Sequence, residues 1–163
     1  MKQTETTFTS IYHRYANDVY RFAYWLCGDT DEAKDIAAET FVRLWTADVE
    51  PNLGSMKAFL LTIARNLYLH ELRKSKKRTA MPEQLADENQ QPDQKAEAAA
   101  DLQRTMNILQ TLPEMDRTVL LMRAQGGLSY EEIAGSTGLT LASVKVKIYR
   151  TRKALQSKFQ QTR

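Results

Sequence analysis

Apolar positions recur along the chain at spacings of three and four, and no stretch of useful length alternates with the period of a strand. The first such segment begins near Phe8 and ends near Gly28, where the pattern breaks. We expect one long amphipathic helix here, whose inner face carries Phe8, Ile11, Tyr12, Tyr15, Val19, Phe22, Ala23 and Leu26. The same spacing continues in later segments, so the pattern predicts an all-α protein.

Two further helices follow in the first half of the chain. Asp29 or Thr30 is suited to cap the second helix, and a break with turn residues at 51–55 precedes a third helix from about Met56 towards Lys77. The predicted inner stripe of the second helix is Ala33, Ile36, Ala37, Phe41, Leu44 and Trp45. The predicted buried side of the third is Phe59, Leu60, Ile63 and Leu67.

The composition then changes to Pro, Glu, Gln, Asp and Asn, with scarcely an apolar residue. Such a segment cannot bury enough surface to offset its ordering entropy, so it predicts a flexible linker. We place an N-terminal domain at residues 1–78, the linker at 79–95 and a C-terminal domain at 96–163. Within the last, helical patterning resumes from Ala96 to Leu112, and a helix starting at Pro113 is expected to run to about Ala124.

The C-terminal domain ends in a predicted helix-turn-helix. Ser129 and Glu132 form the sequence pattern of a capping box, which starts a helix at about Tyr130. Gly138 suits the turn, because glycine adopts left-handed backbone angles without strain, and Thr140 can cap the next helix. The apolar stripe of that last helix is Leu141, Val144, Ile148 and Leu155.

The opposite face of the last helix is basic. Its candidate DNA contacts are Ser143, Lys145, Lys147, Tyr149 and Arg150. An ordinary helical hairpin with a solvated basic face is the alternative. A solvated face usually mixes positive and negative side chains, whereas every charged residue from Lys145 to Lys158 is Lys or Arg. The pattern therefore favours a DNA-binding helix.

The net charge of +3 hides two basic segments separated by acidic ones. Residues 51–81 hold seven Lys and Arg against one acidic residue, and residues 123–163 hold eight against two. The segment 82–101 between them holds one against six. Two basic surfaces predict two separate contacts with a polyanion, and the acidic segments argue against a protein that simply coats nucleic acid.

Enzymatic, metal and membrane functions find little support. Cys27, the single cysteine, cannot form an internal disulfide and is expected to be a buried apolar residue. The chain has only two histidines, His13 and His70, so we do not expect a zinc site built from Cys and His, and two carboxylates on one helix make a weak metal site. No nucleophile and base pairing, phosphate loop, membrane span or signal peptide is evident. We expect a cytoplasmic, non-enzymatic protein without a cofactor.

Three segments, in order, resemble parts of one family. DEAKDIAAETFVRLW at 31–45 is similar to the core-polymerase-binding helix of bacterial extracytoplasmic-function (ECF) sigma factors, in the sigma-70 superfamily. FLLTIARNLYLHELRKSKKR at 59–78 resembles their minus-10 helix, and the segment from 112 to 155 resembles their minus-35 domain. The resemblance covers nearly the whole chain and implies a factor that directs promoter-specific initiation by RNA polymerase.

The resemblance also assigns roles to individual residues. Asp35 and Glu39 are expected to dock on the basic coiled coil of the largest polymerase subunit, and Asn66 to read a base of single-stranded minus-10 DNA, helped by a loop at 52–57. The expected phosphate contacts on the same helix are Arg65, Arg73, Lys74 and Lys77. The alternative interpretation is that Asp35 and Glu39 belong to a solvated acidic face and that Asn66 is an ordinary surface amide. An anti-sigma factor is a further possible partner.

The main rival is an autonomous transcription regulator, whose N-terminal domain would sense a ligand or dimerise. Such a protein should dimerise and bind duplex operator DNA alone, whereas a sigma factor should need core polymerase. A helical interaction module that never touches DNA is disfavoured by the two basic segments.

Overall fold

The computed structural model describes residues 2–47, 56–77 and 94–161, which form seven α-helices and no strand within those ranges. The all-α prediction is therefore confirmed. The predicted linker at 79–95 lies outside the described residues, apart from its last two positions, which begin a helix. In order the helices are α1 (Lys2–Cys27), α2 (Thr30–Thr46), α3 (Met56–Lys77), α4 (Gln94–Gln110), α5 (Glu114–Ala124), α6 (Tyr130–Thr137) and α7 (Leu141–Gln161).

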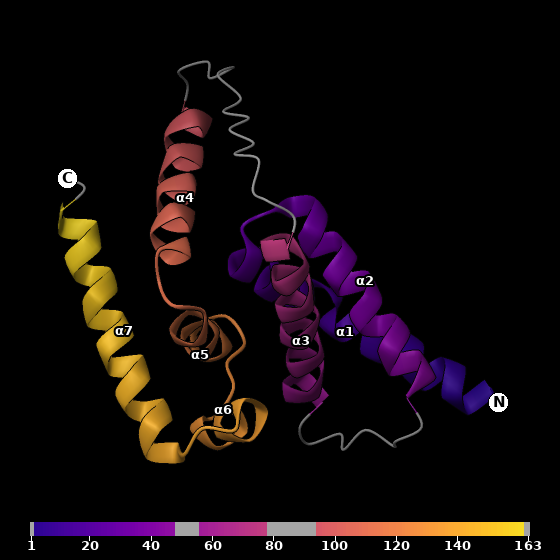
Figure 1. Cartoon of the computed structure of the whole chain (residues 1–163). Coiled ribbons are helices and arrows are strands. Elements are labelled where there is room, and N and C mark those ends of the chain that lie inside the picture. The colour runs from indigo at the N-terminus through magenta and orange to yellow at the C-terminus, as the bar shows by residue number, and fades with distance from the viewer. Residues whose placement is uncertain (1, 48–55, 78–93, 162–163) are drawn as a thin grey trace.

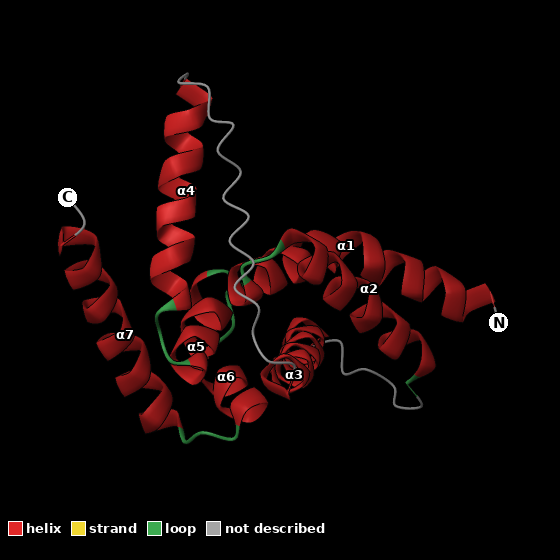
Figure 2. Ribbon diagram, turned by 45° about the horizontal axis from the view of Figure 1, so that its top comes forward, coloured by secondary structure: helices red, strands yellow, loops and turns green. Residues whose placement is uncertain are grey.

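Helices α1, α2 and α3 form an N-terminal bundle in which α2 lies along α1 and α3 packs across both (Figure 2). The turn between α1 and α2 uses Gly28 at φ 78°, which glycine adopts without a Cβ penalty. Asp29 then caps α2, because its carboxylate accepts a hydrogen bond from the Glu32 amide at 2.8 Å. Of the two predicted caps, Asp29 is the one used.

The predicted inner faces of α1 and α2 are wrong at two aromatic positions. Trp45 is 51% exposed and Tyr12 is 45% exposed. Trp45 lies in the last turn of α2, where its ring packs edge-on against Phe8 with centroids 4.9 Å apart. Thr40 is fully buried instead, since its hydroxyl donates to the Ile36 carbonyl at 2.7 Å and so removes the cost of burying a polar group.

Helices α4 to α7 form a C-terminal bundle that ends in the predicted helix-turn-helix (Figure 1). The capping box is present: the Ser129 hydroxyl accepts from the Glu132 amide at 3.1 Å, and the Glu132 carboxylate accepts from the Ser129 amide at 3.0 Å. Gly138 ends α6 at φ 79°, and Thr140 accepts from the Ser143 amide at 3.1 Å to cap α7. These local predictions are confirmed.

The two bundles pack against each other, with α5 and α6 between α3 and α7 in both ribbon views (Figures 1 and 2). Buried apolar residues from α1, α2 and α3 join residues of α5, α6 and α7 in one continuous core. Val144 and Ile148 hold α7 to that core as predicted, whereas Leu141 at the start of α7 is 37% exposed. The helix-turn-helix, α6 and α7, thus packs on the rest of the chain through α3, α4 and α5.

Cys27, at the end of α1, is half-buried rather than fully buried, and its thiol donates to the Asp29 carbonyl at 3.3 Å. Burial raises the pKa of the Cys27 thiol to about 11, and the hydrogen bond to Asp29 only partly offsets this. We expect iodoacetamide at pH 8 to alkylate the native chain about a hundredfold more slowly than the urea-unfolded chain, because the thiolate is the reactive form. Equal rates in the two states, measured by mass spectrometry, would refute the protected thiol.

Candidate nucleic-acid interface

The basic side of α7 is open to solvent at most of its predicted DNA contacts. Lys145 and Arg150 are exposed, Tyr149 is 61% exposed, and Ser143 is half-buried. The fifth, Lys147, is half-buried and donates to the Asp116 carboxylate on α5 at 2.9 Å. The structure therefore presents three of the five side chains freely and orients Lys147 through an ion pair.

Aromatic rings support the cations around α7. The Arg123 guanidinium of α5 lies 4.5 Å from the ring centroid of Tyr130. The Lys145 ammonium of α7 lies 6.0 Å from the centroid of the same ring. Lys153 lies 4.8 Å from the ring of Tyr149. Each of these contacts holds a long cationic side chain against an aromatic ring and so restricts its conformations.

The predicted minus-10 residues of α3 lie in three environments. Asn66 and Arg73 are exposed and seven residues apart, so they share one face of the helix. Lys74 is exposed and lies 3.9 Å from the Glu71 carboxylate. Lys77 ends α3, and its side chain is outside the described residues. Of the loop expected at 52–57, residues 52–55 are outside them too, and residues 56–57 belong to the first turn of α3. Arg65 is the exception, since it is buried.

Arg65 is held by the C-terminal bundle. Its Nε donates to Glu114 Oε1 at 3.1 Å and its Nη2 to Glu114 Oε2 at 3.3 Å, and its side chain is 11% exposed. Glu114 is the first residue of α5 and also accepts a hydrogen bond from Thr118 at 2.7 Å. Sequence reasoning placed Arg65 on DNA phosphate and gave Glu114 no role, so the structure adds a partner that the sequence pattern did not reveal.

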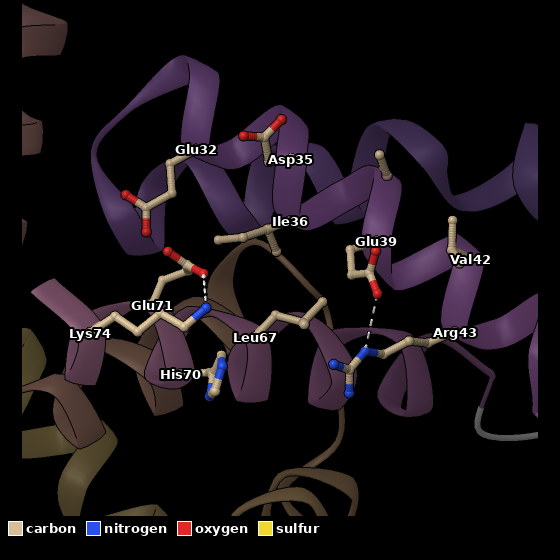
Figure 3. A pocket seen from close by; sticks show the side chains of 11 residues that line it. Glu32, Asp35, Ile36, Glu39, Val42, Arg43, Leu67, His70, Glu71 and Lys74 are labelled. Atoms are coloured by element: carbon tan, nitrogen blue, oxygen red, sulfur yellow. Dashed lines mark ion pairs between the residues drawn. The ribbon is translucent and has the colours of Figure 1, made fainter.

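The acidic residues expected to meet polymerase lie on the solvent side of α2. Asp35 is exposed, and Glu39 is exposed while pairing with Arg43 at 3.5 Å. A groove between α2 and α3 runs beside them (Figure 3), with Leu67 at its base. Burial raises the pKa of Glu32 in this groove, and the nearby carboxylates of Asp29, Glu71 and Asp35 raise it further. Its other lining residues include Ile36, His70 and Lys74.

A second groove, which sequence reasoning missed, follows the contact of α1 with α2. It is mainly apolar, and its lining shares Ala38 and Val42 with the acidic groove. Val42 is 52% exposed and Trp45 51% exposed, so apolar surface borders the carboxylates of α2 directly. The remaining lining residues are Phe8, Thr9, Tyr12 and Phe41.

Two observations bear on metal and membrane functions. Among the described residues, no group of three or more His, Cys, Asp or Glu side chains is arranged to hold a metal ion. Within the same residues, no helix combines the length and the apolar character needed to cross a membrane.

Comparison with known proteins identifies the family. The profile of Sigma-70 region 2 matches residues 11–78, and that of Sigma-70 region 4 matches residues 102–155. The ECF RNA polymerase sigma factor EcfG of Rhodopseudomonas palustris is 30% identical over 83% of this chain and 76% of its own length. The chain belongs to the ECF sigma factors. It is therefore a non-enzymatic factor of the sigma-70 family that directs transcription initiation by RNA polymerase.

Other relatives agree in sequence and in fold. The ECF sigma factor SigE of Mycolicibacterium smegmatis is 33% identical over 88% of this chain, which spans 58% of SigE. The sigma factor RpoE of Bartonella quintana, solved in complex with the anti-sigma factor NepR, is 25% identical with a TM-score of 0.75, and the match covers 96% of this chain and 99% of RpoE. The ECF resemblance predicted from the sequence is thus confirmed.

Proposed function

We propose that this sigma factor binds core polymerase through α2, captures the minus-10 strand with α3 and binds the minus-35 duplex with α7. The observation that carries the proposal is that one chain presents two separate cationic helices, α3 and α7, together with an acidic helix, α2, which packs against α3. Phosphate contacts need cations, and a basic partner surface needs carboxylates. The N-terminal domain at 1–78 and the C-terminal domain at 96–163 divide these tasks.

The polymerase surface combines charge with apolar contact. Asp35 and Glu39 attract a basic partner, and the neighbouring exposed Val42 and Trp45 supply area that is removed from water on binding. A helix with basic and apolar faces has the matching chemistry. The basic coiled coil of the largest polymerase subunit is the partner we propose, which places the protein in the cytoplasm, where transcription occurs.

On α3, Asn66 is proposed to read an unstacked base while Arg73, Lys74 and Lys77 hold the phosphates around it. A single-stranded base can be read by a side-chain amide only if that amide reaches solvent, and Asn66 is exposed. Arg65 can join this set once Glu114 no longer holds it. A second proposed partner is an anti-sigma factor, because the related RpoE is bound by NepR.

On α7, Arg150 is the proposed reader of the minus-35 element, since Arg binds guanine through two hydrogen bonds and Lys145 and Lys147 suit phosphates. We expect Arg150→Ala to reduce transcription about tenfold from promoters that depend on their minus-35 element. Lys158→Ala is the matched control, because it also removes one positive charge from α7. The Lys158 ammonium donates to the Thr111 hydroxyl at 2.6 Å, and Lys158 is not among the proposed DNA contacts. Equal activity of Arg150→Ala and the control on such promoters would contradict the assignment.

The rival regulator is separated from this proposal by two binding measurements. Size-exclusion chromatography with light scattering should give a monomer that joins core polymerase, and gel shifts should show weak binding of duplex promoter DNA by the free chain. A stable dimer that binds duplex DNA tightly without polymerase would support the autonomous regulator instead.

A further inference from the structure

We propose that Val146, on the second helix of the helix-turn-helix, reads the C5-methyl group of a thymine in the minus-35 element. The inference rests on the proposed function, which places α7 against the minus-35 duplex. It adds a specificity-determining residue beside Arg150 and names one base that the element has to contain.

Helical geometry places Val146 at the centre of the outward face of α7. Val144, Ile148 and Thr151 are buried and define the inner face. At 3.6 residues per turn, the Val146 side chain points about 190° away from their mean direction, so it faces directly away from the core. It is 45% exposed, and α7 lies at the edge of the molecule in both ribbon views (Figures 1 and 2).

The two lysines next to Val146 lie on the flanks of α7 and contact other helices. The Lys145 ammonium lies 6.0 Å from the ring centroid of Tyr130 on α6. The Lys147 ammonium donates to the Asp116 carboxylate on α5 at 2.9 Å. Because these contacts direct both cationic groups towards neighbouring helices, the centre of the outward face is left apolar. Cations on either side of it are placed to contact the phosphate backbones of a duplex.

The chemistry of valine limits what it can recognise, since its side chain neither donates nor accepts a hydrogen bond. In the major groove, the edges of guanine, adenine and cytosine offer donors and acceptors, and thymine also offers a methyl group. Contact with that methyl group removes apolar surface of both partners from water. A polar base edge in the same place would lose its hydrogen bonds to water without replacement. Thymine is therefore the base that fits opposite Val146.

The position of Arg150 locates the thymine within the element. Arg150 is exposed and lies four residues after Val146, so their β-carbons are about 6 Å apart on one side of the helix. Base pairs follow one another at about 3.4 Å along the duplex. Two side chains so placed reach base pairs that are about two steps apart at most. We expect the thymine within about two base pairs of the guanine that Arg150 reads.

The test replaces thymine by deoxyuridine, which pairs with adenine in the same way and lacks only the C5-methyl group. Target sites are first selected from fragmented genomic DNA, by the full-length chain with core polymerase and by the chain alone. Each thymine of the selected element, on both strands, is then replaced in turn, and gel-shift titration measures the affinity. We expect one replacement near the Arg150 guanine to weaken wild-type binding about fourfold, the effect of one buried methyl group.

Variants at Val146 assign the effect to this side chain. Val146→Ala should bind the thymine and deoxyuridine duplexes equally, because its shorter side chain no longer reaches the methyl group. Val146→Thr should keep most of the discrimination, since its γ-methyl group can make the same contact. Leu102→Ala is the matched control, because Leu102 is an apolar residue on α4 that is 46% exposed and has no proposed DNA contact. This control should discriminate as wild type does.

Two results would overturn the inference. The first is a selected element, with or without A·T pairs, in which no deoxyuridine replacement near the guanine weakens binding. The second is a replacement that weakens Val146→Ala as much as wild type.

Transcription with core polymerase separates this inference from the proposed function. Specific transcription together with either of those two results would retain the proposed function and reject the methyl contact. A Val146-dependent methyl effect on sites that the chain binds alone, without transcription, would retain the contact and reject the role in initiation. Failure to select any duplex site, with or without core polymerase, would reject both.

Discussion

Replacing Asp35 with Arg is expected to abolish binding of core RNA polymerase while leaving the fold intact. Asp35 is exposed on α2, beside Glu39 and the apolar strip formed by Val42 and Trp45. A reversed charge places like charges together at the proposed interface, which costs several kcal/mol and lowers the affinity by about a hundredfold or more. Co-elution of the chain with core enzyme on size-exclusion chromatography measures the effect.

Two controls limit the interpretation of Asp35→Arg. Asp101→Arg makes the same charge change on α4 and should leave co-elution unchanged. Thermal unfolding by circular dichroism should match wild type for both variants, because both side chains are exposed. Undiminished co-elution of Asp35→Arg would show that α2 is not the polymerase-binding helix.

The largest expected loss of stability follows from Phe22→Ala. Phe22 is fully buried in the core that joins residues of both bundles. Removing its ring should lower the free energy of unfolding by about 3–5 kcal/mol, a large part of the 5–15 kcal/mol typical of a domain. Urea unfolding followed by circular dichroism should show a lower midpoint in a single transition, because the bundles share that core.

The neighbouring Arg21 provides the control for Phe22, since it is exposed on the same helix. Arg21→Ala should change the free energy of unfolding by less than about 0.5 kcal/mol. A loss below 1 kcal/mol for Phe22→Ala, or separate transitions for the two bundles, would contradict a common core.

Local features of the fold were predictable because their causes are local. The capping box of Ser129 and Glu132, the Asp29 cap and the Gly138 turn depend on residues within four positions of one another. Helical periodicity also placed α3 at the bounds the structure has. Side-chain hydrogen bonds and backbone preferences act over such short separations, so the sequence carries their signal directly.

The predicted burial failed where tertiary packing decides it. Trp45 continues the apolar stripe of α2, but it lies in the last turn, where its ring packs edge-on against Phe8 and the side chain stays 51% exposed. The exposed ring of Trp45 lines the apolar groove between α1 and α2. Periodicity alone cannot distinguish an apolar residue that lines a groove from one in the core. Thr40 shows the converse, because a local hydrogen bond allowed a polar residue to be buried.

The contacts between the bundles were not predictable from pattern. Arg65 and Glu114 are 49 positions apart, as are Tyr68 and Arg117, and no periodicity connects such pairs. One signal was present: Arg117 lies two residues before the apolar run from Val119 to Met122, and a cation on a buried stripe needs a partner. The sequence gives no means of naming Tyr68 as that partner.

Transcription in vitro from fragmented genomic DNA, with purified core polymerase and the wild-type chain, tests the assignment most directly. The proposed promoter recognition predicts discrete start sites that appear only when both proteins are present and that weaken with Asp35→Arg and Arg150→Ala. Absence of specific transcripts with core enzyme, together with tight duplex binding by the chain alone, would contradict it.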